Sequence, residues 1–142
     1  MVPLATRTEQ ATVAWMKSEP RAVLVTDERA EVIDLVRQSL HASKSRSPLM
    51  VLSQPVELRL YLVDSLRAHR EPALVVLNGQ DAEGFSLMAW MRAQPNAIAR
   101  IPIIAIGGAW TGSGWEDVSV MSGTPSVSAF ASVMRGVLSP ES

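Results

Sequence analysis

The stretch Pro72-Ala73-Leu74-Val75-Val76-Leu77-Asn78-Gly79 is the part of the sequence that indicates the fold class. It holds five consecutive apolar residues, 73–77, which are followed by an amide and a glycine. An unbroken apolar run of this length is typical of a strand that is buried on both faces of a parallel sheet. In a doubly wound sheet, ligands and chemistry lie at the carboxyl ends of the strands, so Asn78 is expected to stand at that edge.

The pair Asn78-Gly79 also fits another interpretation, because Asn-Gly is a strong signal for a two-residue hairpin turn. A hairpin would require a second strand directly after the turn. The residues beyond Gly84 instead carry Phe85, Met88 and Met91 at helical spacing. We therefore interpret Asn78 as the end of a parallel strand that leads into a helix.

Similar apolar runs alternate with helical patterns along the chain, which predicts repeated strand-helix units and an α/β fold with a parallel sheet. The predicted strands are 22–25, 49–52, 73–77, 101–106 and 118–121. Four helices are predicted from their inward-facing stripes, which are Val32, Ile33, Val36 and Leu40; Leu58, Leu62 and Leu66 after Pro55; Phe85, Met88 and Met91 after Gly84; and Val127, Phe130, Met134 and Val137 after Thr124-Pro125.

The segment after the fourth predicted strand has an unusual composition, with four glycines among residues 107–114. Glycine disfavours helix, so we expect a Gly-rich loop that shortens or replaces a fourth helix, followed by the strand at 118–121. A shortened helix over 115–121 is the alternative. Trp110 and Trp115 either close over the core or form an exposed interface patch, because aromatic side chains are typical anchors of protein interfaces.

The overall composition limits the classes of partner. The chain has 142 residues, 13 lysines and arginines against 14 aspartates and glutamates, and no cysteine. Its length predicts one domain, its balanced charge favours neither nucleic acid nor membrane, and the missing thiols exclude disulfides and thiolate metal sites. No apolar stretch approaches the roughly 20 residues of a membrane span, and residues 1–8 lack the features of a secretory signal, so a cytoplasmic protein is expected.

The chain is expected to divide into an N-terminal extension, residues 1–20, and an α/β domain, residues 21–142. Residues 8–17 have a helical pattern with small and apolar residues on one face. This segment is expected to serve packing or dimer contact.

Three segments carry a resemblance to a known family. They are the run from Pro72 to Asn78, the sequence Arg100-Ile101-Pro102-Ile103-Ile104-Ala105-Ile106, and the pair Thr124-Pro125. With the order of strands and helices, they resemble the CheY-like receiver domain of bacterial response regulators over about residues 21–138. The resemblance implies a doubly wound, five-stranded, flavodoxin-like sheet in the order 2-1-3-4-5, and a phosphorylation pocket at the carboxyl ends of its strands.

The same resemblance indicates that the reactive groups of this pocket are missing. It places Asn78 at the position of the aspartate that accepts the phosphoryl group, and an amide is neither an adequate nucleophile nor a charged ligand for a hard cation. It places Thr26 and Asp27 at the acid pair that holds Mg²⁺, which leaves one carboxylate there, although Glu28 follows directly. We therefore expect poor metal affinity.

The hydroxyl and the lysine of receiver chemistry are also absent from their positions. Gly107 falls where the hydroxyl belongs. Thr124, or Ser122 in another register, falls where the lysine belongs. Because Lys17 and Lys44 are the only lysines of the chain, no register supplies a lysine at the fifth strand.

These departures predict a pseudo-receiver, which is a non-catalytic signalling module that acts through a protein partner or as a homodimer, without phosphorylation, in a two-component-type phosphorelay pathway. No cofactor, catalytic residue or metal is expected. The alternatives are a small-molecule or nucleotide binding domain that uses the Gly-rich loop, and a phosphorylatable response regulator that uses a nearby acid such as Asp81. His41 and His69 lie without clustered acids and are expected to be solvated surface residues.

Overall fold

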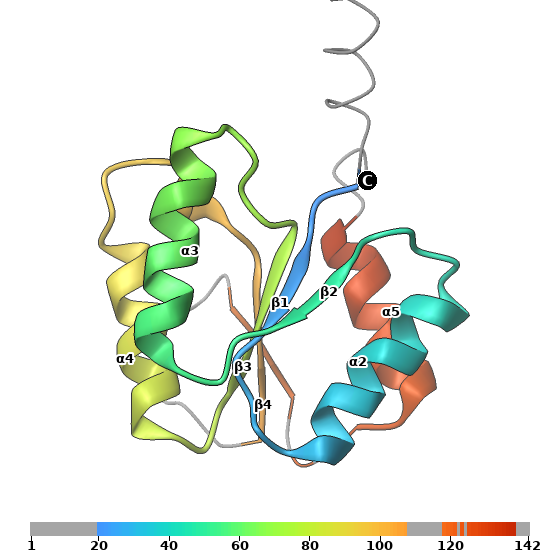
Figure 1. The fold of residues 1–142 in the computed structure, drawn as a ribbon. Helices are drawn as coiled ribbons and strands as arrows, with labels where there is room; N and C mark the ends of the chain where they lie inside the picture. The colour runs from blue at the N-terminus through green and yellow to red at the C-terminus, as the bar shows by residue number, and fades with distance from the viewer. Residues whose placement is uncertain (1–19, 108–117, 122, 124, 139–142) are drawn as a thin grey trace, which may run out of the picture.

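The computed structural model describes residues 20–107, 118–121, 123 and 125–138. The core is a five-stranded sheet in the order β2-β1-β3-β4-β5, and every neighbouring pair of strands is parallel. The strands are β1 (Val23–Val25), β2 (Leu49–Val51), β3 (Leu74–Asn78), β4 (Ile103–Ile106) and β5 (Ser119–Met121). The predicted α/β class and strand order are therefore confirmed (Figure 1).

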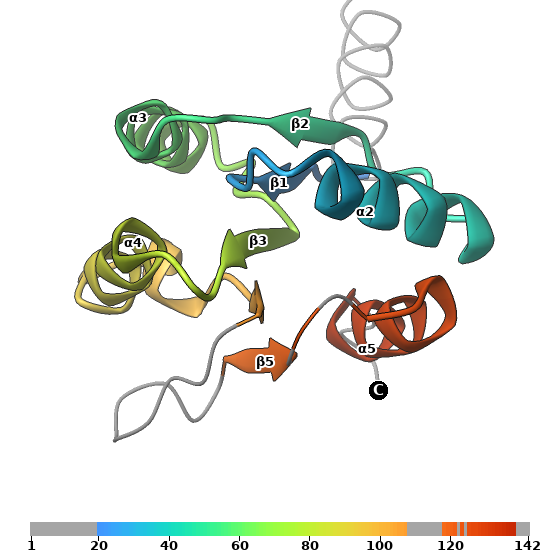
Figure 2. The same cartoon turned by 90° about the horizontal axis from the view of Figure 1, so that it is seen from below.

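The helices cover both faces of this sheet. They are α2 (Ala30–Ala42), α3 (Pro55–Arg67), α4 (Ala82–Arg92) and α5 (Val127–Leu138), and the 3-10 turn η1 (Ala97–Arg100) precedes β4. Helices α2 and α5 lie on one side of the sheet, and α3 and α4 lie on the other (Figure 2). Each side has its own apolar cluster, as a doubly wound sheet requires.

Position in the sheet explains the burial of the strands. The residues of β1 and β4 are all buried, and in β3 only the terminal Asn78 is not, because these strands are central and covered on both faces. Side chains alternate between the two clusters, so Leu24 packs toward α3 while Val23 and Val25 pack toward α2. The edge strands β2 and β5 are only partly buried.

Two local expectations need correction. We expected the third helix to follow Gly84, but α4 begins at Ala82, because the carboxylate of Asp81 accepts a hydrogen bond from Glu83 N and caps the first turn. At the last helix, the hydroxyl of Ser126 accepts a hydrogen bond from Ala129 N, so it is Ser126 that supplies a cap. The last helix was expected directly after Thr124-Pro125, but α5 begins at Val127. Thr124 itself lies outside the described residues.

Residues 119–121 form a strand and not a helix, which confirms the fifth strand and excludes the alternative there. Residues 108–117, where we expect a Gly-rich loop to shorten or replace a fourth helix, lie outside the described residues together with Trp110 and Trp115. Residues 1–19 of the predicted N-terminal extension, 1–20, lie outside them as well. The division of the chain at residue 20 therefore stays a prediction. Within the described ranges, no helix has the length and apolar character needed to span a membrane.

Candidate functional site

The carboxyl ends of β1, β3 and β4 meet at one edge of the sheet and bring four of the predicted residues together. Thr26 and Asp27 follow β1, and the backbone N–H of Thr26 donates to Val76 O at 3.0 Å. Asn78 ends β3 opposite Ile106, and Gly107 follows β4 directly. Parallel pairing alone produces this convergence, because it places all carboxyl ends on the same side.

Asp27 is the buried acid of this edge, with an exposed fraction of 1%. Its carboxylate is held by Arg29, whose Nη2 donates to Oδ2 at 2.7 Å and whose Nε donates to Oδ1 at 3.0 Å. The backbone N–H of Arg29 donates to the same Oδ1 at 3.0 Å. This is a two-pronged guanidinium-carboxylate pair, the geometry in which arginine binds a carboxylate most strongly.

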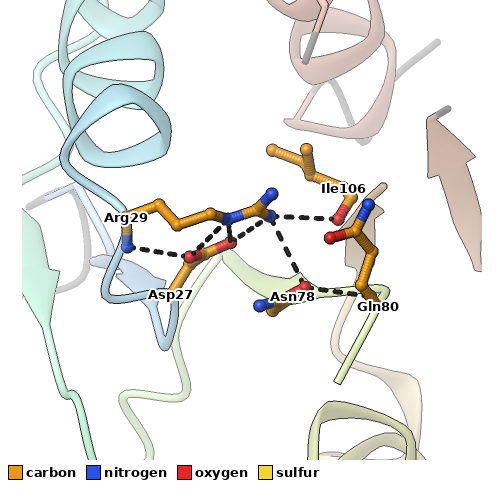
Figure 3. Close-up of polar contacts among 5 residues, drawn as sticks. All are labelled: Asp27, Arg29, Asn78, Gln80 and Ile106. Atoms are coloured by element: carbon orange, nitrogen blue, oxygen red, sulfur yellow. Dashed lines mark hydrogen bonds and ion pairs between the residues drawn. The ribbon is translucent and has the colours of Figure 1, made fainter. Parts of the chain in front are cut away.

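The guanidinium of Arg29 also reaches the neighbouring strands (Figure 3). Its Nη2 lies 3.5 Å from Oδ1 of Asn78 and 3.4 Å from the carbonyl oxygen of Ile106. One nitrogen therefore contacts oxygens that belong to β3, β4 and the segment after β1. The side-chain hydrogen bond with Asp27 raises the pKa of Arg29 above its ordinary value despite the opposing effect of burial, so the group stays cationic.

The side-chain amide of Asn78 is held by the backbone of the following residues as well as by Arg29. Its Oδ1 accepts a hydrogen bond from Gln80 N at 2.9 Å, which closes a turn typical of asparagine. The backbone N–H of Gly79 donates to Ile106 O at 2.9 Å. The side-chain oxygen of Asn78 is thus shared between Arg29 Nη2 and Gln80 N.

Gly107 has a backbone conformation that suits glycine, with φ of 75°. Its N–H donates to Met121 O at 2.6 Å, which ties the end of β4 to β5. A side chain at this position would meet the side chain of Gln80, whose atoms lie 3.2 Å from an ideal Cβ. A hydroxyl-bearing residue here would be strained and would compete with Gln80 for space.

A polar cavity of about 370 Å³ opens at this edge. Its lining includes Asp27, Arg29 and Asn78 together with three further acids, Glu28, Asp81 and Glu83. Glu28 and Asp81 were considered from the sequence, but Glu83 was not. Glu28, Asp81 and Glu83 are exposed. Asp81 uses one carboxylate oxygen to cap α4, as described above. The charged residues that line this cavity are therefore four acids, Asp27, Glu28, Asp81 and Glu83, and one cation, Arg29.

Arg29 is the site residue that sequence reasoning missed. It occupies the N-cap of α2 without any side-chain cap hydrogen bond. Ser, Thr, Asp and Asn are preferred at an N-cap, and a cation there opposes the helix dipole. An arginine at such a position is a signal that its charge is used elsewhere, but the signal becomes visible only once the start of α2 is known.

The residues present do not fit the divalent cation that the receiver fold implies. Asp27 is the buried carboxylate here, and Arg29 already occupies the oxygens of Asp27, Asn78 and Ile106 that converge at this edge. Hard cations such as Mg²⁺ need several free, preferably charged oxygens. Among the described residues, no group of three or more histidine, cysteine, aspartate or glutamate side chains could hold a metal ion.

The remaining predicted residues are placed as follows. His41 and His69 are exposed, as expected. Thr124, Trp110 and Trp115 lie outside the described residues, so their assignment to the pocket and to an interface stays a prediction.

Comparison with known proteins supports the fold. No family model matches the sequence. No curated protein matches it either. Among solved structures, the signal receiver domain of a DNA binding response regulator from Colwellia psychrerythraea 34H aligns with a TM-score of 0.62 and 17% identity, over 83% of this chain and 98% of its own.

Two further solved structures are similar. The phosphorylated cyanobacterial phytochrome response regulator RcpA aligns with a TM-score of 0.60 and 16% identity, over 83% of this chain and 91% of its own. The Mn²⁺-bound form of response regulator Rcp1 aligns with a TM-score of 0.57 and 16% identity, over 86% of this chain and 94% of its own. At these identities the likeness establishes the receiver fold, and the predicted resemblance to receiver domains is confirmed at that level.

We predict that Asn78 deamidates slowly in the folded protein, although Asn-Gly is the most reactive sequence for this change. The reaction needs Gly79 N to attack the side-chain amide carbon, but Gly79 N donates to Ile106 O and the amide oxygen is held by Gln80 N. The folded chain should react slower than the unfolded chain by roughly tenfold or more, because local opening must come first. Peptide mapping of samples aged with and without urea measures this ratio, and equal rates would contradict the prediction.

Proposed function

We propose that this protein is a receiver-like signalling module of a bacterial two-component-type pathway that acts through protein-protein contact and accepts no phosphoryl group. The observation that carries the proposal is the amide of Asn78 at the end of β3, where receiver domains keep the acceptor aspartate. An amide oxygen is a weak nucleophile, and this one is held by Arg29 and by the Gln80 N–H. Under this proposal Thr26, Asp27, Asn78, Gly107 and Thr124 form a degenerate acceptor pocket, and the module is not an enzyme.

The placement of two positively charged side chains, Lys44 and Arg29, supports the same proposal. Catalysis of phosphoryl transfer depends on positioned positive charge around the phosphoryl oxygens. Lys44 is exposed and follows the C-terminal end of α2, whereas the pocket lies at the N-terminal end of that helix. Arg29 is bound by the carboxylate of Asp27, so its charge is already compensated.

The partner is proposed to be another protein or a second copy of this chain in the cytoplasm. A nucleotide is less favoured as a ligand of the cavity, because the lining carries the acids Asp27, Glu28, Asp81 and Glu83 against one arginine. Phosphate groups would be repelled there. A thermal-shift panel of nucleotides and flavins tests this second candidate, since a ligand at about 100 times its dissociation constant adds about 2.7 kcal/mol of stability.

Acetyl phosphate with Mg²⁺ tests the proposal directly. We expect intact-mass spectrometry to show no added phosphoryl group under conditions that fully modify an active response regulator run in parallel. An adduct on the wild-type chain would contradict the proposal. The variant Asp81→Asn then assigns it, because loss of the adduct in this variant would mean that Asp81 is the acceptor and that the chain is a phosphorylatable regulator.

A further inference from the structure

We propose that the guanidinium of Arg29 takes the place of the divalent metal ion at this edge of the sheet, as a cation built into the chain. The inference rests on the proposed function, because it concerns the same degenerate pocket. It adds a mechanism for keeping the pocket assembled when no metal is bound, and it assigns that mechanism to one side chain.

The geometry of Nη2 supports this inference. It contacts three oxygens of three different chemical kinds: the carboxylate of Asp27 at 2.7 Å, the amide of Asn78 at 3.5 Å and the backbone carbonyl of Ile106 at 3.4 Å. Carboxylate, amide and carbonyl oxygens are the ligand types of a hard cation. Here they surround a nitrogen that carries part of a delocalised positive charge, at hydrogen-bond distances (Figure 3).

Burial makes this cation necessary. Asp27 is 1% exposed, and a buried carboxylate without a compensating charge is strongly unfavourable. A bound metal ion would compensate the negative charge of Asp27. In this chain Arg29, two residues further along, compensates that charge instead. The side chain of Arg29 is 28% exposed, so the cation reaches the pocket from its rim while the anion lies inside.

An ordinary local ion pair does not explain the whole arrangement. The Arg37–Asp34 pair on the same helix is equally short, at 2.7 Å, but both side chains are exposed and lie three residues apart on one helix. Arg29 instead extends across the ends of β3 and β4, although its position at the helix N-cap is unfavourable for a cation. The pair Arg37–Asp34 is therefore a matched control for Arg29–Asp27.

Mn²⁺ titration followed by NMR tests the wild-type chain without any substitution. We expect Mn²⁺ at millimolar concentration to leave the signals of the Asn78 side-chain amide and the Gly79 N–H unbroadened. Selective broadening of these signals would show that a metal displaces Arg29 and would overturn the inference.

The variant Arg29→Ala tests the compensation itself. We expect its Tm to fall by roughly 5–10 °C, because a buried carboxylate loses its partner. Addition of Mg²⁺ or Mn²⁺ at about ten times its dissociation constant should then raise the Tm by roughly 3–6 °C, with Mn²⁺ broadening now confined to Asn78 and its neighbours. The control Arg37→Ala should lose little stability and gain none from metal.

Other variants keep the test decisive if Arg29→Ala folds poorly. The double variant Asp27→Asn/Arg29→Ala removes the buried charge together with its partner, so it should recover most of the lost Tm and should not respond to metal. Arg29→Lys keeps the charge but has a single nitrogen of shorter reach, so it should fall between wild type and Arg29→Ala. An Arg29→Ala chain that is as stable as wild type, or that no metal stabilises, would overturn the inference.

These outcomes are separate from those of the phosphorylation test. Metal binding by the wild-type chain would overturn the role of Arg29 but leave the inert Asn78 in place. A phosphoryl adduct at Asp81 without Mn²⁺ broadening at Asn78 would overturn the proposed function and leave the role of Arg29 standing.

Discussion

The substitution Gly79→Ala is expected to destabilise the protein by about 3 kcal/mol, because the added methyl group has no space. A Cβ at Gly79 would collide with the carbonyl oxygen of Gly107 and would lie 3.3 Å from that of Ile106. Both obstacles are backbone atoms at the end of β4, so no side chain can rotate away. The end of β3 would have to move away from β4, which would also separate Asn78 from Ile106.

Urea denaturation of wild type and Gly79→Ala measures this loss. The variant Gly136→Ala is a matched control, because Gly136 lies in α5 and a Cβ there meets nothing within 4 Å. Alanine is preferred to glycine inside a helix, so this control should gain roughly 0.5–1 kcal/mol. Equal responses of the two variants would show that contact with β4 is not what requires glycine at position 79.

Truncation of Phe130 to alanine is expected to cost about 3–5 kcal/mol, the largest loss among the single substitutions that we predict. Phe130 lies in α5, is fully buried, and packs in the cluster between α5, α2 and the sheet. Its removal leaves a cavity in a layer that holds two helices against β1, β3 and β4. The measurement is again the free energy of unfolding in urea.

The variant Phe85→Ala provides the control for this second prediction. Phe85 is only partly buried at the edge of the opposite cluster, so the same truncation should cost clearly less. A loss at Phe85 that equals or exceeds the loss at Phe130 would contradict the description of the two clusters.

The sequence predicted the strands and helices because most of them carry simple apolar patterns. The runs around Leu24, Val75 and Ile104 are central strands, and short unbroken apolar runs are typical of strands that are covered on both faces. The start of α4 was misplaced because the prediction followed the apolar stripe and gave Gly84 the role of a turn. Gly84 lies instead inside the first turn of α4, where a Cβ would collide with the carbonyl oxygen of Asn78.

The candidate site was predicted in part. Asn78 and Gly107 directly follow apolar runs, and Asp27 follows one residue later, after Thr26. The resemblance to receiver domains assigned these positions to one pocket, and parallel pairing places them at the same edge of the sheet. Arg29 was not found, because its role depends on the path of a long side chain across two other strands. No spacing in the sequence encodes that reach. The side chain of Gln80 fills the space beside Gly107, and this contact likewise arises only from the folding of the two loops together.

The contact between Arg29 and the ends of β3 and β4 has a consequence for the conditions under which the module can work. A dissociable ion occupies its ligands only in proportion to its free concentration, whereas a side chain attached two residues from Asp27 is present in every molecule. If Arg29 acts as proposed, chelators and changes in cellular magnesium should leave this module unaffected while they alter regulators that depend on a bound ion.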